Sequence, residues 1–141
     1  MKSIFNILVF ATVFIAGCTK NSSNPSANGN SSNSTSITGN FVITKFTDSN
    51  PNEDKTTQFT GYVFTFTADG KIVAEKNGVT TTGSYVEKPS HEGEGAKLNI
   101  IFSDAPLNAL SKNWQVNLIS NSAIHLADDD NSTEVLEFTA Q

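Results

Sequence analysis

Residues 59–66 read FTGYVFTF, and this stretch decides the fold class. Aromatic side chains occupy every second position from Tyr62 through Phe64 to Phe66, with Val63 and Thr65 between them. Alternation with a period of two is typical of a β-strand that has one face in a core and the other toward water. The stretch therefore predicts an antiparallel strand with a buried aromatic face.

The same alternation recurs through the rest of the chain after residue 37, and no helical repeat is longer than about two turns. Leu98, Ile100 and Phe102 share one face of a predicted strand, and Trp114, Val116 and Leu118 share another. Strands are predicted over residues 39–46, 59–68, 71–75, 79–86, 96–103, 113–120, 123–127 and 133–139. This pattern predicts an all-β domain of eight antiparallel strands, either a closed up-and-down barrel or a sandwich.

Turn residues support these boundaries. Asp69-Gly70 and Asn77-Gly78 are pairs that tolerate positive φ, so each predicts a tight hairpin between its flanking strands. The segment 104–111 predicts at most one short helical turn, and 87–95 is a polar loop.

The N-terminal residues 1–17 have the pattern of a secretory signal peptide, with Lys2 followed by the apolar run 4–16. The run is shorter than the roughly 20 apolar residues that a membrane-spanning helix needs. Ile15-Ala16-Gly17-Cys18 has the order of a bacterial lipobox and resembles the processing site of lipoprotein precursors.

That resemblance implies cleavage before Cys18, a diacylglyceryl group on its thiol and acylation of the new amino group. The alternative is an ordinary buried Cys18 at the end of an uncleaved helix. An intrachain disulfide is excluded because the chain has one cysteine. Several acyl chains together hold a protein on a bilayer, so we expect a protein of the cell envelope, anchored to the outer membrane.

Residues 18–36 follow as a Ser- and Asn-rich segment that has no large apolar residue, which predicts a disordered tether. Residues 37–141 form the predicted folded domain. The formal net charge of the chain is −5 and all its basic residues are lysines. Because Arg supplies the planar fork that favours phosphate recognition, nucleic acid is not an expected partner.

Several short motifs carry a resemblance to a family. Gly39-Asn40-Phe41, Gly83-Ser84-Tyr85 and the runs 59–66, 98–102 and 110–116 together resemble small lipocalin-like lipoproteins of Bacteroidetes bacteria, over residues 37–139. The resemblance implies an eight-stranded lipocalin-like barrel. The family's function is unassigned.

Candidate chemistry is sparse. Asp128, Asp130 and Glu134 form an oxygen-rich loop that is a weak candidate for Ca²⁺, although it lacks the EF-hand glycine, and a solvated acidic hairpin is the favoured interpretation. His91 with Glu92 and Glu94 lies in a Gly-rich loop, and His125 lies on a predicted strand facing away from Ile124 and Leu126. No catalytic or cofactor motif is present, so neither catalysis nor a cofactor is expected.

Two binding hypotheses remain, beside a structural or inhibitory role in the envelope. In the first, the barrel holds a small apolar ligand, with a lining formed by Phe41, Tyr62, Phe64, Tyr85 and Trp114. In the second, the same side chains fill the interior, and the outer loops bind a protein or glycan. An eight-stranded barrel has room for either arrangement, and the number of aromatic residues favours the filled core.

Overall fold

The computed structural model describes residues 36–48, 53–89, 91, 95–130 and 133–141. Its strands are β1 (Gly39–Thr47), β2 (Val63–Phe66), β3 (Lys71–Lys76), β4 (Val79–Lys88), β5 (Lys97–Ile101), β6 (Asn113–Ile119), β7 (Ala123–Asp128) and β8 (Val135–Ala140). Two 3₁₀ turns, η1 (Thr56–Phe59) and η2 (Leu107–Leu110), interrupt the series.

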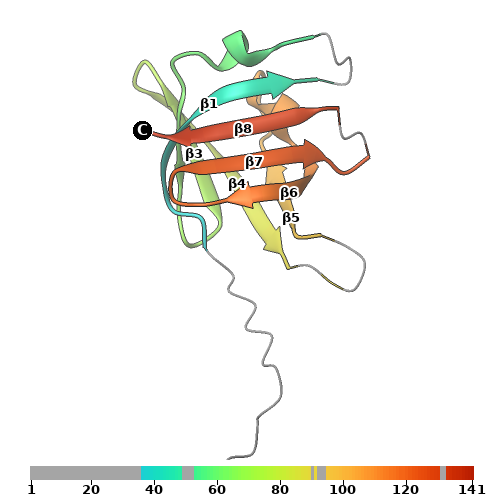
Figure 1. The fold of residues 1–141 in the computed structure, drawn as a ribbon. Coiled ribbons are helices and arrows are strands. Elements are labelled where there is room, and N and C mark those ends of the chain that lie inside the picture. Colours follow the sequence, from blue (N-terminus) through green and yellow to red (C-terminus); the bar gives the residue numbers. More distant parts are fainter. Residues whose placement is uncertain (1–35, 49–52, 90, 92–94, 131–132) are drawn as a thin grey trace, which may run out of the picture. The chain divides into compact units, whose positions relative to one another are not determined.

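The strands form a closed barrel in sequence order, and every neighbouring pair is antiparallel (Figure 1). Closure comes from β1 and β8, which pair from Phe41–Ala140 to Thr47–Val135. The predicted all-β barrel is therefore confirmed, and the sandwich is not formed. Each strand buries one face because all inward side chains must share the single interior.

Both predicted glycine turns are formed. Asn77 has φ of 55° and Gly78 has φ of 77°, the positive values that a two-residue hairpin requires. Gly70 has φ of 80°, and its carbonyl oxygen accepts a hydrogen bond from the Tyr85 amide at 2.8 Å.

Two details of the predicted strands are wrong. The strand predicted to start at Phe59 starts at Val63, because Phe59 belongs to η1 and Gly61 turns the chain at φ of 84°. Leu118 does not share the face of Trp114. The register between β6 and β7 shifts after Val116, so Leu118 is 42% exposed while Ile119 packs against the core.

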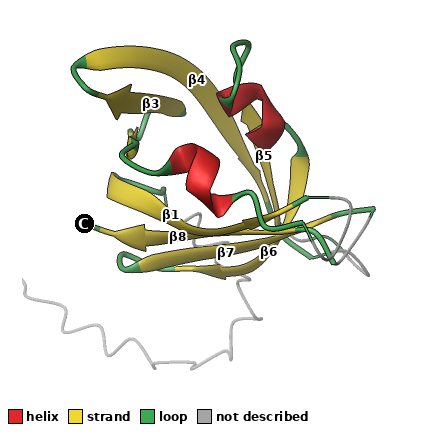
Figure 2. Cartoon of the chain, turned by 90° about the horizontal axis from the view of Figure 1, so that it is seen from above, coloured by secondary structure: helices red, strands yellow, loops and turns green. Residues whose placement is uncertain are grey.

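The hydrogen-bonded pairing is shortest at two places in the barrel, between β1 and β2 and between β5 and β6. At each place a 3₁₀ turn lies beside one of the strands, η1 beside β1 and η2 beside β5 (Figure 2). β1 pairs with β2 over three residues only, and the Thr56 hydroxyl oxygen of η1 accepts a hydrogen bond from the Phe46 amide at 2.8 Å. β5 pairs with β6 over three residues only, and the Ser111 hydroxyl bonds both the amide and the carbonyl of Phe102, at 2.7 and 2.9 Å. The predicted helical turn is η2; η1 was not predicted.

Candidate functional site

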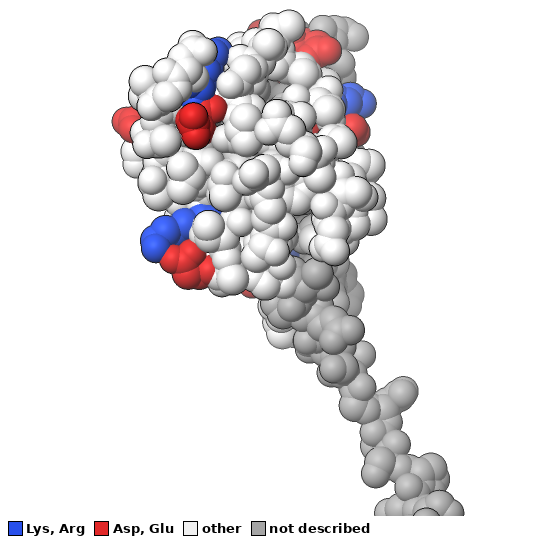
Figure 3. Space-filling model, turned by 90° about the vertical axis from the view of Figure 1, so that its left-hand side faces the viewer, with Lys and Arg blue, Asp and Glu red and all other residues white. Residues whose placement is uncertain are grey.

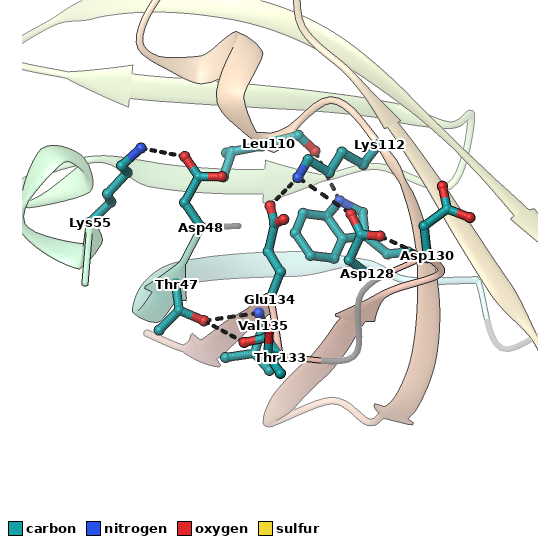
Figure 4. Close-up of polar contacts among 11 residues, drawn as sticks. Thr47, Asp48, Lys55, Leu110, Lys112, Asp128, Asp130, Thr133, Glu134 and Val135 are labelled. Carbon is teal, nitrogen blue, oxygen red and sulfur yellow. Dashed lines mark hydrogen bonds and ion pairs between the residues drawn. The ribbon is translucent and has the colours of Figure 1, made fainter. Parts of the chain in front are cut away.

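A compact ion-paired cluster lies at the ends of β6, β7 and β8, and Figure 4 draws it together with its neighbours. The Lys112 ammonium donates a hydrogen bond to Glu134 Oε1, and it lies 3.3 Å from Asp128 Oδ2. The same ammonium lies 5.7 Å from the centre of the Trp114 ring. We call Lys112, Asp128 and Glu134 the lysine triad.

Strand geometry brings the lysine triad together. Lys112 comes two residues before Trp114, which is buried and lies opposite Asp128 in the ladder. Glu134 comes two residues before the buried Leu136, and its carbonyl oxygen accepts a hydrogen bond from the Asp128 amide at 2.9 Å. Because side chains two apart share a strand face, all three charged groups continue inward-facing rows.

Burial makes the lysine triad unusual among the described residues. Glu134 is 2% exposed and is the one buried charged residue in that part of the chain, while Asp128 and Lys112 keep 13% and 30% of their side-chain surface. A buried carboxylate is tolerated when it is paired and hydrogen-bonded, and Lys112 supplies that partner.

The electrostatics of Lys112 follow from the same contacts. Burial of the ammonium lowers its pKa, but the hydrogen bond and charge of Glu134, and then those of Asp128, outweigh burial. The pKa of Lys112 is therefore raised above its usual range, and the group stays protonated at neutral pH.

A shallow hollow of about 300 Å³ opens beside the lysine triad and is lined by Lys112, Asn113, Asp128, Asp129 and Asp130. Lys97 pairs with Asp129 at 2.8 Å on its exposed rim. The Asp130 amide donates a hydrogen bond to Asp128 Oδ1 at 2.8 Å. The hollow is thus polar, and two lysines partly balance its aspartates.

The three residues named as a weak Ca²⁺ candidate do not all converge. Asp128 and Glu134 both face Lys112, whose ammonium lies where a shared cation would have to be, and Asp130 is exposed. Within the described ranges, no group of three or more His, Cys, Asp or Glu side chains is placed to hold a metal ion. Lys112 was not predicted as a site residue, although its spacing of two residues from Trp114 carried the signal.

The aromatic residues predicted as a possible ligand lining lie in the barrel interior. Phe41, Phe64, Tyr85 and Trp114 are at most 5% exposed, and Tyr62 is partly buried. Ring contacts connect the interior, for example Phe64 with Phe138 at 5.4 Å between centroids. Further contacts join Phe41–Phe66, Phe66–Phe138, Phe66–Tyr85, Phe64–Phe102, Tyr62–Phe64, Phe59–Tyr62, Phe46–Phe59 and Phe46–Trp114.

Polar atoms of this aromatic interior are hydrogen-bonded to the backbone. Trp114 Nε1 donates to the Leu110 carbonyl oxygen at 2.9 Å. The Tyr85 hydroxyl lies 2.8 Å from the carbonyl oxygen of Ile37 and 2.9 Å from that of Thr67. The Ile37 amide in turn donates to Glu87 Oε1 at 3.1 Å. Tyr85 and Glu87 therefore fasten the chain just before β1 onto β4.

The two histidines lie apart from the lysine triad. His125 is partly buried between the buried Ile124 and Leu126, and it pairs with Glu137 of β8 and Leu118 of β6. His91 is exposed. Glu92 and Glu94, like Cys18 and the predicted signal peptide and tether up to residue 35, lie outside the described residues.

No helix in the described part of the chain is long and apolar enough to cross a membrane. On the face drawn in Figure 3, charged side chains are sparse, and lysine atoms lie close to Asp or Glu atoms. Exposed large apolar side chains in the described ranges are Val79, Val86, Ile101 and Leu118.

Comparison with known proteins identifies a fold but no family for the chain. No protein-family model matches it, and no curated protein matches its sequence. Among solved structures, it is similar to the crystal structure of a DUF4847 family protein from Bacteroides vulgatus, with a TM-score of 0.50 and 15% identity. The match covers 75% of this chain and 94% of the other. It shows that the barrel of this chain has a counterpart in a Bacteroides protein.

Proposed function

We propose that this chain is a lipid-anchored protein of the bacterial outer membrane whose barrel is a non-catalytic interaction module. The observation that carries the proposal is the set of mutual ring contacts inside the barrel, which joins Phe41, Phe64, Tyr85 and Trp114 to other buried aromatics. These contacts support an interior filled by side chains, and they favour recognition through the outer surface and loops.

A protein partner fits this surface better than a glycan. Sugar rings stack on exposed aromatic faces, but the phenylalanines, Trp114 and Tyr85 of the described chain are all buried. Tyr62, the remaining aromatic, is partly buried with Lys76 Nζ 4.8 Å above its ring. The exposed aliphatic residues Val79, Val86 and Ile101 instead provide small apolar contacts within a polar surface.

The anchor is tested by Cys18. Membrane-fraction protein from the native host should begin at Cys18 and carry acyl mass, and Cys18→Ala should be released or left unprocessed. Intact Met1 on an unmodified chain would refute the anchor.

The mode of binding is tested separately by site-specific photo-cross-linking in cells. We expect a photoreactive residue to form a discrete adduct with a partner protein from at least one of the positions Val79, Val86 and Ile101. The matched control is Thr82, an exposed residue on the same outer row of β4 as Val86. Equal, diffuse labelling at every position would contradict a specific interaction surface.

The alternative of an apolar-ligand carrier makes a different prediction. A carrier would take up an apolar fluorescent dye with saturation, and the buried Trp114 would change its emission. We expect neither effect with the folded wild-type chain. A saturable response that Phe64→Leu weakens would favour the carrier instead.

A further inference from the structure

The lysine triad brings an amine and two carboxyl groups together in a partly buried place, where Glu134 is 2%, Asp128 13% and Lys112 30% exposed. Lys112 Nζ lies 3.3 Å from Asp128 Oδ2 and donates a hydrogen bond to the 2%-exposed Glu134. The ring of the fully buried Trp114 covers one side of the amine. Because the amine already contacts the Asp128 carboxyl group, the two groups have the proximity that favours an intramolecular reaction.

We propose that Lys112 and Asp128 condense to an isopeptide bond, with Glu134 as the proton-transfer group. Lys112 is the nucleophile, the Asp128 carboxyl carbon is the electrophile, and Glu134 contacts the amine directly. The product is an amide cross-link between the start of β6 and the end of β7.

The reaction is balanced within the lysine triad. Glu134 takes a proton from the Lys112 ammonium, and Nζ then bonds to the Asp128 carboxyl carbon. Oδ2 accepts the Glu134 proton and a second proton from Nζ, and it leaves as one water molecule. Ammonium and carboxylate thus become an amide and water, with no oxidant or co-reactant.

A third group stabilises the charge that develops on Asp128. Its Oδ1 accepts a hydrogen bond from the Asp130 amide at 2.8 Å. This donor is placed to hold the negative oxygen of the tetrahedral intermediate and later the amide oxygen.

The proton count allows the reaction. The reacting complex holds the same number of protons as the ion-paired triad, since the proton only moves from Lys112 to a carboxylate. The pairing that raises the pKa of Lys112 stabilises the ammonium, so the amine becomes nucleophilic only when Glu134 takes its proton within the triad.

A nearby ion pair serves as the matched control. Lys97 and Asp129 are 2.8 Å apart, but Asp129 is 32% exposed on the rim of the hollow, against 13% for Asp128, so water solvates its carboxylate more fully. We expect no condensation there.

Trypsin provides a direct test on the full-length chain. Lysine is the only basic cleavage residue, and Lys112 is the last one in the sequence. An acylated Lys112 is not cleaved. The cross-linked chain should therefore yield residues 98–141 as one peptide that is lighter by one water, and fragmentation should place the bond between Lys112 and Asp128. The unreacted chain should yield 98–112 and 113–141 at full mass.

Variants separate the cross-link from folding. Lys112→Arg keeps the positive charge but should remove the water loss, and Glu134→Gln should remove it through loss of the proton carrier. Lys97→Arg should leave it intact. If circular dichroism shows that Glu134→Gln does not fold, the comparison of wild type with Lys112→Arg tests the proposal. Full-mass peptides from folded wild type after prolonged incubation, or a bond mapped to another residue, would overturn the proposal.

Discussion

Gly83 lies on the inward row of β4, where the ring of Phe102 packs directly over the backbone. A Cβ at this position would lie 2.5 Å from the Ile101 carbonyl oxygen and 2.6 Å from the Phe102 ring. Gly83→Ala should therefore lower the free energy of unfolding by about 1–3 kcal/mol, the usual cost of overpacking. Urea denaturation measures this change.

The control for that substitution is next in the sequence. Ser84 is exposed on the opposite face of β4, so Ser84→Ala should change the stability by less than about 0.5 kcal/mol. Equal effects of the two substitutions would show that Phe102 moves aside freely.

Tyr85 links stability to alkaline pH. Burial of its hydroxyl raises the pKa; the hydrogen bond with Ser36 opposes this shift, while the charges of Glu87 and Asp69 add to it. Because its pKa is raised, Tyr85 keeps its proton to a higher pH in the folded chain than in the unfolded chain. Its contribution to stability is therefore complete below the pKa of tyrosine in the unfolded chain, about 10, and is lost as the pH rises above that value.

Tyr85→Phe should remove that alkaline loss. At pH 7 the substitution should cost about 1 kcal/mol because the hydrogen bonds to the Ile37 and Thr67 carbonyls disappear. Unfolding free energies of both proteins between pH 7 and 11 give the comparison. A wild-type slope above pH 10 that the variant fully retains would assign the loss to another group.

At the scale of elements, the segments around the two 3₁₀ turns supply hydrogen bonds to β1 and to the end of β5, where the β1–β2 and β5–β6 ladders are short. The Phe46 amide depends on the Thr56 hydroxyl of η1. Thr56→Val keeps the shape but leaves this amide without its acceptor, so it should cost about 1–3 kcal/mol. The Phe46 amide should also exchange its hydrogen faster, as measured by NMR.

Thr56→Ser is the matched variant for this seam because it keeps the hydroxyl. It should preserve the slow exchange of the Phe46 amide. Fast exchange in both variants would indicate that the η1 backbone, rather than the hydroxyl, protects the seam.

Elements also show where sequence reasoning succeeds. The eight strands and both glycine hairpins could be predicted, since period-two alternation and positive-φ turn residues are local signals. The β6 shift that exposes Leu118 could not be, because a bulge reflects pairing with β7. The lysine triad was missed although Lys112, Asp128 and Glu134 each lie two residues from a predicted core position; charged residues at strand ends ordinarily face water.

At the scale of the whole molecule, we expect residues 37–141 to fold without the preceding segment. Limited proteolysis of the full chain should remove the N-terminal segment and leave the barrel, because the described ladder starts at Gly39. The trimmed product should keep a β-type circular dichroism spectrum and a cooperative thermal transition. A helical or unfolded spectrum would contradict this prediction.

The seam between β1 and β8 joins the first strand to the last, and the Gln141 amide donates to the Asn40 carbonyl oxygen at 3.0 Å. The two ends of the barrel sequence are therefore spatial neighbours, and the fold is a ring opened at one point. β8 is synthesised last, so β1 can pair with it only after almost the entire chain has been made. Pairing between residues this far apart in the sequence slows folding. A circular permutant that joins these ends by a short linker and opens at Asn77-Gly78 would make the β1–β8 contact local and the β3–β4 contact long-range, so it should keep the same barrel while β3–β4 becomes the pairing that must wait for the whole chain.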